Sequence, residues 1–87
     1  MSKAKFTRAD LVFREFIKEL RLGLNLTQKE LAERLGLPQS FVSKYETGER
    51  RLDFVETAFV CEVLGMSLEA FAAEFTRRLS KVKGARI

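Results

Sequence analysis

Four polar side chains share one face of a short helix predicted over residues 38–47: Gln39, Ser40, Ser43 and Lys44. Together with Thr47 they span an arc of about 140°, while Val42 and Tyr45 lie opposite or beside that arc. A glutamine amide pairs bidentately with adenine N6 and N7, a serine donates or accepts, and a lysine reaches guanine O6 and N7. This face has the chemistry to read base edges. Periodicity alone leaves open the alternative of an ordinary solvated helix face.

A second helix must hold this face in place, because only the turn "GLP" separates it from a helix predicted over residues 28–35. A link this short forces the two helices to cross steeply, as in a helix-turn-helix. Ala32 is small where the two backbones would meet, and Gly36 opens the turn. We expect Leu37 to pack into the core.

Start and stop signals predict an all-α chain with five helices. Polar N-caps precede four of the helices: Thr7, Thr27, Asp53 and Ser67. Four glycines are expected to end helices by adopting positive φ: Gly23, Gly36, Gly48 and Gly65. The apolar spacing agrees, and no strand-like alternation competes. The predicted helices cover about residues 8–22, 28–35, 38–47, 54–64 and 68–79.

The fourth predicted helix is rich in apolar residues. Its core-facing positions are expected to be Val55, Ala58, Phe59 and Cys61 to Leu64. We interpret Cys61, the only cysteine, as a buried thiol, because nothing in the sequence indicates the exposed, activated thiolate of a redox sensor.

The composition fits one compact domain of 87 residues, 46% of them hydrophobic. A single cysteine and the lack of histidine exclude intramolecular disulfides, Cys/His zinc sites and His-based triads. We therefore expect no metal and no cofactor. No signal peptide and no run of ~20 apolar residues occurs, which predicts a cytoplasmic protein without a membrane partner.

The net charge of +4 lies mainly at the chain ends. Residues 1–8 carry three positive charges and residues 77–87 carry five, whereas residues 9–76 carry eight basic and twelve acidic side chains. We assign a single domain to residues 1–79 and a basic flexible tail to residues 80–87. Each basic end either adds sequence-independent attraction to phosphate or is simply solvated chain.

The stretch "LTQKELAERLGLPQSFVSKYETG" resembles the helix-turn-helix of the lambda repressor/Cro (XRE) family of bacterial and phage regulators. The resemblance covers residues 10–66, including the Thr-Gln opening, the Ala and Gly of the turn, and the Glu-x-Gly ending. It implies a compact five-helix, lambda-repressor-like domain that binds double-stranded DNA. In such a domain Gln39, Ser40 and Lys44 would read bases, and Ser43 would contact a base or the DNA backbone.

The same resemblance implies contacts to phosphate. Gln28 matches a phosphate-contacting glutamine, and the free N–H groups at its helix N-terminus would assist it. Two arginines fall in the loop where the family often contacts phosphate again. The expected phosphate-binding set is Thr27, Gln28, Arg50 and Arg51.

Two further positions on the helix over residues 38–47 have assigned roles. Glu46 projects next to Val42 and needs a partner if half buried; the resemblance implies a structural ion pair with Arg21. Catalysis by Glu46 has little support without a second acid, a histidine or a phosphate loop, so we predict no enzyme. Phe41 departs from the small or hydroxyl residue of many relatives. Packing against a neighbouring helix is favoured over contact with a thymine methyl group.

Proteins of this type usually bind palindromic DNA as two-fold dimers, so we expect a homodimer. The fifth predicted helix has apolar residues at helical spacing: Leu68, Phe71, Ala72, Phe75 and Leu79. Part of this stripe must cap the core of the monomer, but Phe75 and Leu79 lie beyond the family's compact core. They therefore predict a dimer interface on this helix.

The sequence thus predicts a transcriptional regulator that occupies a palindromic operator. Control would come from site occupancy, from the dimer equilibrium or from contact with RNA polymerase. The size also resembles controller proteins of restriction–modification systems and stand-alone repressors. An alternative from another class is an antitoxin-like module whose helical domain or tail neutralises a protein partner.

Overall fold

The computed structural model describes residues 7–82 and contains five α-helices in that range. They are α1 (Arg8–Gly23), α2 (Gln28–Leu35), α3 (Gln39–Thr47), α4 (Phe54–Val63) and α5 (Leu68–Lys81). The all-α prediction is confirmed, and every helix begins and ends within two residues of its predicted bounds. Helix α5 continues into the predicted tail, of which residues 83–87 lie outside the described residues.

The predicted N-caps Thr27 and Asp53 are found at the starts of α2 and α4. Thr27 Oγ1 accepts a hydrogen bond from the Glu30 N–H at 3.0 Å, and the Glu30 carboxylate accepts one from the Thr27 N–H at 2.9 Å. Asp53 and Glu56 form the same reciprocal pair at the start of α4. Each pair satisfies donors that would otherwise have no intrahelical acceptor, so both helix starts are well defined.

The turn between α2 and α3 differs from the prediction in one side chain. Gly36 has a φ of 72°, and the following N–H, that of Leu37, donates to the Ala32 carbonyl oxygen at 3.0 Å. This left-handed ending caps α2. Leu37 itself is 37% exposed, so its predicted burial is wrong. The Leu37 amide caps the last turn of α2, and the Leu37 side chain remains exposed in the turn.

The end of α1 also differs from the prediction. Gly23 is the last helical residue and does not have positive φ; that conformation occurs two residues later, at Asn25, with a φ of 58°. Asparagine adopts this conformation more readily than most residues.

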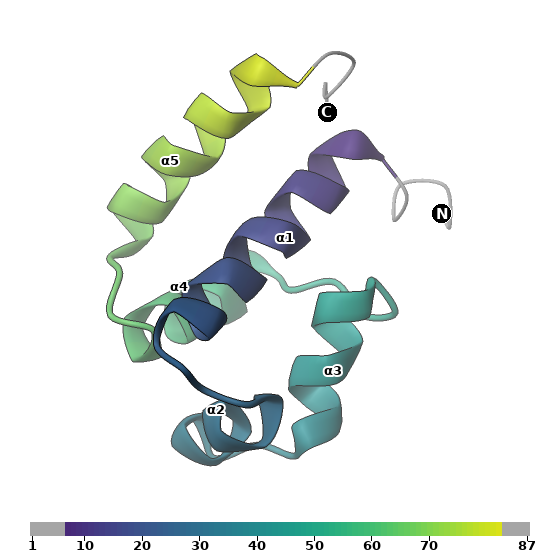
Figure 1. The fold of residues 1–87 in the computed structure, drawn as a ribbon, viewed down its shortest axis with the longest axis vertical. Helices are drawn as coiled ribbons and strands as arrows, with labels where there is room; N and C mark the ends of the chain where they lie inside the picture. Colours follow the sequence, from purple (N-terminus) through teal and green to yellow (C-terminus); the bar gives the residue numbers. More distant parts are fainter. Residues whose placement is uncertain (1–6, 83–87) are drawn as a thin grey trace.

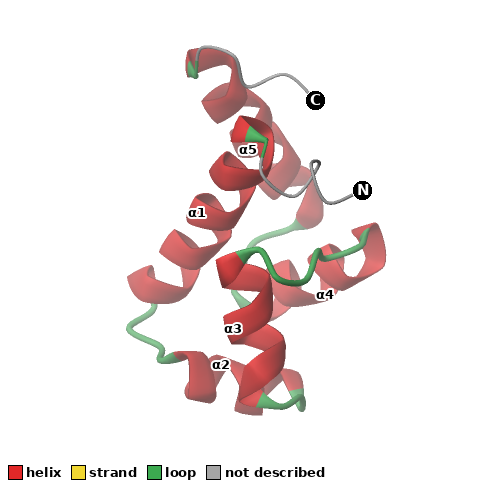
Figure 2. Cartoon of the chain, turned by 90° about the vertical axis from the view of Figure 1, so that its right-hand side faces the viewer, coloured by secondary structure: helices red, strands yellow, loops and turns green. Residues whose placement is uncertain are grey.

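Helices α1 and α5 lie side by side and run in opposite directions (Figure 1). Arg78 of α5 joins them: its guanidinium pairs with Glu19 at 3.0 Å and lies 4.2 Å from the centroid of the Phe16 ring. Helix α2 packs against α3, and α3 stands in front of the other helices in Figure 2. Among the described residues, the outward side of α3 is exposed at Gln39, Ser40 and Lys44.

The core forms where the helices meet, and its most deeply buried side chains come from α1 to α4: Ile17, Leu31, Val42, Tyr45, Val60 and Cys61. Burial raises the pKa of the Cys61 thiol to about 11, so the thiol is neutral near neutral pH. This agrees with the interpretation of Cys61 as a structural residue.

Helix α4 corrects part of the predicted core. Val55 and Phe59 are 75% and 43% exposed, whereas Thr57, Val60 and Cys61 are buried. Apolar residues occur on nearly every side of this helix, so their spacing alone did not identify its inner face. Thr57 lies three residues before Val60 and four before Cys61, which is the spacing of the buried stripe.

Candidate nucleic-acid interface

The outward side of α3 carries the four predicted base-reading residues. Gln39, Ser40 and Lys44 are exposed, and Ser43 is half-buried, with its hydroxyl 3.4 Å from the Ser40 carbonyl oxygen to which it donates. The side chains of Gln39 and Lys44 make no hydrogen bond or ion pair with any residue between 7 and 82. Their donors remain available to another molecule.

The inward side of α3 fixes the orientation of that face. Val42 and Tyr45 are 0% and 1% exposed. Phe41 is half-buried, meets Tyr45 edge to face at a centroid distance of 5.6 Å, and has the Arg50 guanidinium 4.8 Å from its ring centroid. Phe41 also packs against the buried core, which supports packing over contact with DNA. The ring contacts with Tyr45 and Arg50 lie within α3 and the loop that follows it, whereas the prediction was of packing against a neighbouring helix.

The expected ion pair between α1 and α3 is present. Arg21 donates from Nε to Glu46 Oε2 at 2.8 Å and from Nη2 to Oε1 at 3.0 Å. Its third donor, Nη1, binds the Leu26 carbonyl oxygen at 2.7 Å. Arg21 and Glu46 are only 6% and 8% exposed, so the pair lies in the interior and not at its edge. A buried, bidentate pair of this kind fixes α3 against α1.

Glu46 also binds Gln28, one of the predicted phosphate-binding residues. The sequence did not reveal this contact. Gln28 donates from Nε2 to Glu46 Oε1 at 2.9 Å. An amide nitrogen carries two hydrogens, so one donor of Gln28 remains for a phosphate. The N-cap residue Thr27, which is exposed, stands beside it. Residues 28 and 46 are too far apart in sequence for a local pattern to indicate this contact.

Arg14 also supports the C-terminal end of α3 and was not identified from the sequence. It pairs with Asp10 at 2.8 Å, and its Nη1 donates to the Glu46 carbonyl oxygen at 3.4 Å. The Arg14 side chain also lies close to Gly48, the residue after α3: a Cβ atom at this position would be 3.1 Å from the Arg14 guanidinium carbon. A positive charge here interacts favourably with the carbonyl end of the helix. The spacing of Asp10 and Arg14 indicates their own pair, but not the contact with α3.

The two arginines of the loop after α3 differ in their surroundings. Arg50 forms a two-point ion pair with Glu56, from Nη1 to Oε1 at 3.0 Å and from Nη2 to Oε2 at 2.6 Å. A DNA phosphate at Arg50 would have to compete with that carboxylate. The exposed side chain of Arg51 has no hydrogen-bond or ion-pair partner within the described chain. Arg51 is therefore the more available of the two for phosphate.

The Arg50–Glu56 pair gives stability a dependence on pH. Hydrogen bonds from Arg50, and then from the Asp53 backbone, lower the pKa of Glu56 from 4.5 to about 2. Because the folded-state pKa is the lower one, the stabilisation is complete above the ordinary pKa and is lost as pH falls toward 2. We expect Glu56→Gln to destabilise the protein slightly at about pH 7 and less at about pH 3, as measured by urea unfolding. The exposed Glu69→Gln serves as the control, and an equal loss at both pH values would contradict the assignment.

The predicted interface on α5 is largely occupied by the monomer itself. Phe71 is 3% exposed and stacks on Phe16 at a centroid distance of 4.8 Å, so it belongs to the core of the monomer. Phe75 is half-buried and meets Phe13 edge to face at 5.9 Å. Because α1 begins at Arg8, its early turns cover the length of α5 that had been expected to be free. Of the remaining predicted residues, Leu68 and Leu79 are half-buried and Ala72 is exposed.

A different apolar surface is exposed at the start of α4. Phe54, Val55 and Phe59, here called the α4 surface, are 76%, 75% and 43% exposed. Only the six-residue loop between α3 and α4 separates the outward face of α3 from this surface. The sequence prediction assigned Val55 and Phe59 to the core and so missed the α4 surface.

Between residues 7 and 82, no group of three or more acidic or cysteine side chains is placed to hold a metal ion. None of the helices in this range combines the length and the apolar character needed to cross a membrane.

Comparison with known proteins agrees with the geometry. The helix-turn-helix family model matches residues 17–71. A solved XRE-family like protein from Pseudomonas syringae pv. tomato str. DC3000 is 40% identical, with a TM-score of 0.76, over 80% of this chain and 85% of that one. The chain belongs to the XRE-type helix-turn-helix family. As a member, it is a DNA-binding transcriptional regulator.

A second solved structure shares the XRE-type fold. It is a single-residue mutant of the restriction–modification controller protein C.Esp1396I, with a TM-score of 0.76 over 86% of this chain and 95% of that one. Its identity to this chain is 24%, so the likeness concerns the fold alone. No curated protein matches this XRE-type chain.

Proposed function

We propose that the protein reads a specific palindromic operator as a homodimer and regulates transcription as a repressor or controller-type protein. The outward face of α3 carries this proposal. Its amide, hydroxyl and ammonium groups project from a helix whose other side is fixed by buried residues and by the Arg21–Glu46 pair. Such a helix presents its donors to base edges in the major groove without first having to become ordered.

Phosphate contacts would set the position of α3 on the duplex. The remaining Gln28 donor and the N-terminal N–H groups of α2 lie at the positive end of that helix. Arg51, on the loop after α3, supplies a further guanidinium group that has no ion-pair partner among residues 7–82. Together these groups would bind the DNA backbone on two sides of the reading face.

The α4 surface supports a dimer better than the stripe on α5 does. Large apolar side chains that are three-quarters exposed, such as Phe54 and Val55, are characteristic of interfaces. A two-fold contact through this surface would fix the distance between two α3 helices, because only a short loop joins it to each of them. Half-sites one helical turn apart, roughly 34 Å, require such a fixed distance.

Gln39→Ala tests base reading. We expect it to weaken binding to the specific operator by about 1 to 3 kcal/mol and to leave non-specific binding nearly unchanged, because a bidentate base contact is lost. Footprinting on DNA upstream of the gene would supply the operator, and fluorescence anisotropy would measure both affinities. An equal loss on specific and random duplexes would remove Gln39 from the reading face.

Arg51→Gln tests the phosphate contact. We expect similar weakening of binding to every DNA sequence. The slope of the logarithm of the binding constant against the logarithm of salt concentration should fall by about one unit for each arginine replaced in the dimer. Arg77→Gln, at an exposed arginine paired with Glu74 on α5, is the matched control and should leave the slope unchanged. A slope unaltered by Arg51→Gln would exclude Arg51 from the DNA contacts.

An antitoxin-like role would use the same α4 surface for a different protein. The exposure of Phe54 and Val55 is the observation that favours it. A wild-type chain that remains monomeric in solution and on DNA, yet forms a stoichiometric complex with a second protein, would support this role over the homodimer.

A further inference from the structure

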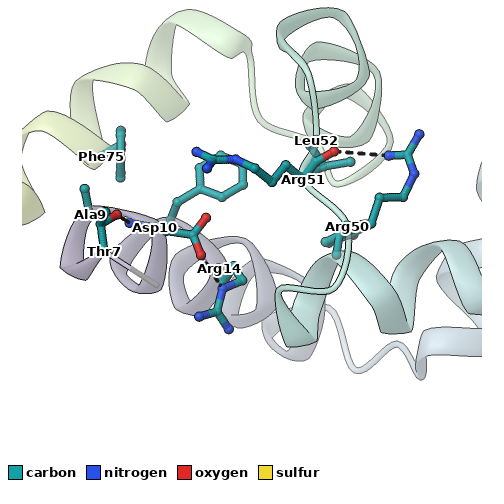
Figure 3. Close-up of a pocket in the computed structure, with 10 residues that line it drawn as sticks. Thr7, Ala9, Asp10, Arg14, Arg50, Arg51, Leu52 and Phe75 are labelled. Carbon is teal, nitrogen blue, oxygen red and sulfur yellow. Dashed lines mark hydrogen bonds and ion pairs between the residues drawn. The ribbon is translucent and has the colours of Figure 1, made fainter. Parts of the chain in front are cut away.

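A pocket of about 210 Å³ lies between the start of α1, the loop after α3 and the middle of α5. Phe13, Leu52 and Phe75 supply an apolar wall, and Arg51 and Asp10 are among the polar residues that line it. Figure 3 shows the Arg51 side chain reaching across the pocket toward α1, whereas Arg50 points to the other side of the loop. The pocket is separate from the outward face of α3.

Among residues 7–82, one positive charge in this pocket has no counterion. Arg14 is paired with Asp10, and Arg50 is paired with Glu56, so each of these arginines has its own carboxylate. Arg51 lines the same pocket, and within residues 7–82 its guanidinium group has no such partner. An apolar pocket with one unbalanced guanidinium group favours a ligand that carries a single negative charge.

We propose that this pocket binds a small organic monoanion: a carboxylate attached to a compact apolar group. The Arg51 guanidinium group matches the two oxygens of a carboxylate, and a lysine at this position would not offer the same planar pair of donors. The apolar group would pack against Phe13, Leu52 and Phe75. The pocket volume limits the ligand to a compact molecule, below the usual size of cofactor sites.

The pocket is connected to the reading face through residues already described. Tyr45 of α3 lines it, and the buried Tyr45 hydroxyl has no hydrogen-bond partner within the described protein. Arg14, also in the lining, packs against the glycine that ends α3. An Arg51 side chain engaged by a carboxylate cannot also bind phosphate. Occupancy therefore weakens DNA binding, a consequence that rests on the proposed function.

Cyclohexanecarboxylate is a suitable probe of binding. Tyr45 is the only tyrosine and there is no tryptophan, so intrinsic fluorescence reports on the pocket wall, and two-dimensional NMR adds the amide signals of Arg51 and Leu52. We expect saturable changes below about 10 mM, with cyclohexanecarboxamide and acetate each at least about tenfold weaker. Lack of saturation in both measurements, or equal binding of the neutral amide, overturns the proposal.

Arg51→Gln should reduce affinity for the probe by at least about tenfold while leaving the fold intact, because Arg51 is exposed and makes no side-chain bond within residues 7–82. Arg77→Gln is the control and should bind the probe as the wild type does. Unchanged affinity in Arg51→Gln overturns the assignment of this site.

A second arm separates the site from the DNA function. Saturating probe should reduce operator affinity of the wild type several-fold and have no effect on Arg51→Gln. A protein that binds the probe but no DNA would leave the pocket proposal standing and overturn the proposed function. A protein that binds its operator but not the probe would overturn the pocket proposal and leave the proposed function standing.

Discussion

Arg21→Met is expected to lower the free energy of unfolding by about 3 to 5 kcal/mol, because it leaves the Glu46 carboxylate buried without its charged partner. Only the Gln28 amide would still donate to that carboxylate, and the Leu26 carbonyl oxygen would lose its donor as well. The pair joins α1 to α3, so the loss should be global. Urea unfolding monitored by circular dichroism measures it, with an unchanged m-value indicating a pure stability effect.

Two companion variants make this result interpretable. Arg77→Met breaks an exposed pair with Glu74 and should change stability by less than about 1 kcal/mol. The double variant Arg21→Met with Glu46→Leu removes both charges and should regain much of the lost stability, because no carboxylate is then left unpaired. If Arg21→Met were as mild as Arg77→Met, the interior pair would not be what holds α3 in place.

Phe54→Glu is expected to reduce operator affinity by about 100-fold or more while leaving each subunit folded. Phe54 is 76% exposed, so the monomer loses little packing. In a two-fold dimer through the α4 surface, two carboxylates would meet near the axis, and the second half-site would no longer be held close by. Sedimentation should show monomers, and affinity for an isolated half-site should be unchanged.

Leu11→Glu is the matched control for this experiment. Leu11 is also an exposed apolar residue, at 43%, but it lies on α1. It should leave both dimerisation and operator binding intact. A Phe54→Glu protein that still dimerises would place the interface elsewhere on the molecule, and a wild type that never dimerises would exclude the dimer altogether.

Local signals in the sequence were sufficient for the helices and for the exposed polar face of α3. A cap such as Thr27 with Glu30 uses residues three apart, and the face of α3 follows from the 3.6-residue period. Both features are properties of a single segment, so neither requires knowledge of the partner helices. The pairing of Arg21 with Glu46, by contrast, was expected only because the sequence resembles a family.

The features that were missed depend on how separate segments meet. Helix α4 is apolar on most sides, so only its position against the core reveals that Val55 and Phe59 face outward. The buried state of Phe71 depends on the length of α1 that lies against α5. The Gln28–Glu46 hydrogen bond joins two helices across their crossing, and no periodicity within either helix encodes it.

In α3, the residues that pack against the protein differ from the residues that face outward, and this affects how the sequence of such a regulator can evolve. Gln39 and Lys44 make no side-chain bond to the rest of the described chain, whereas Val42, Tyr45 and Glu46 supply the attachment. Substitutions at Gln39 and Lys44 should therefore cost little stability. Under the proposed function, a new operator preference would arise there one residue at a time, while the packing of α3 against α1 and α2 stays the same.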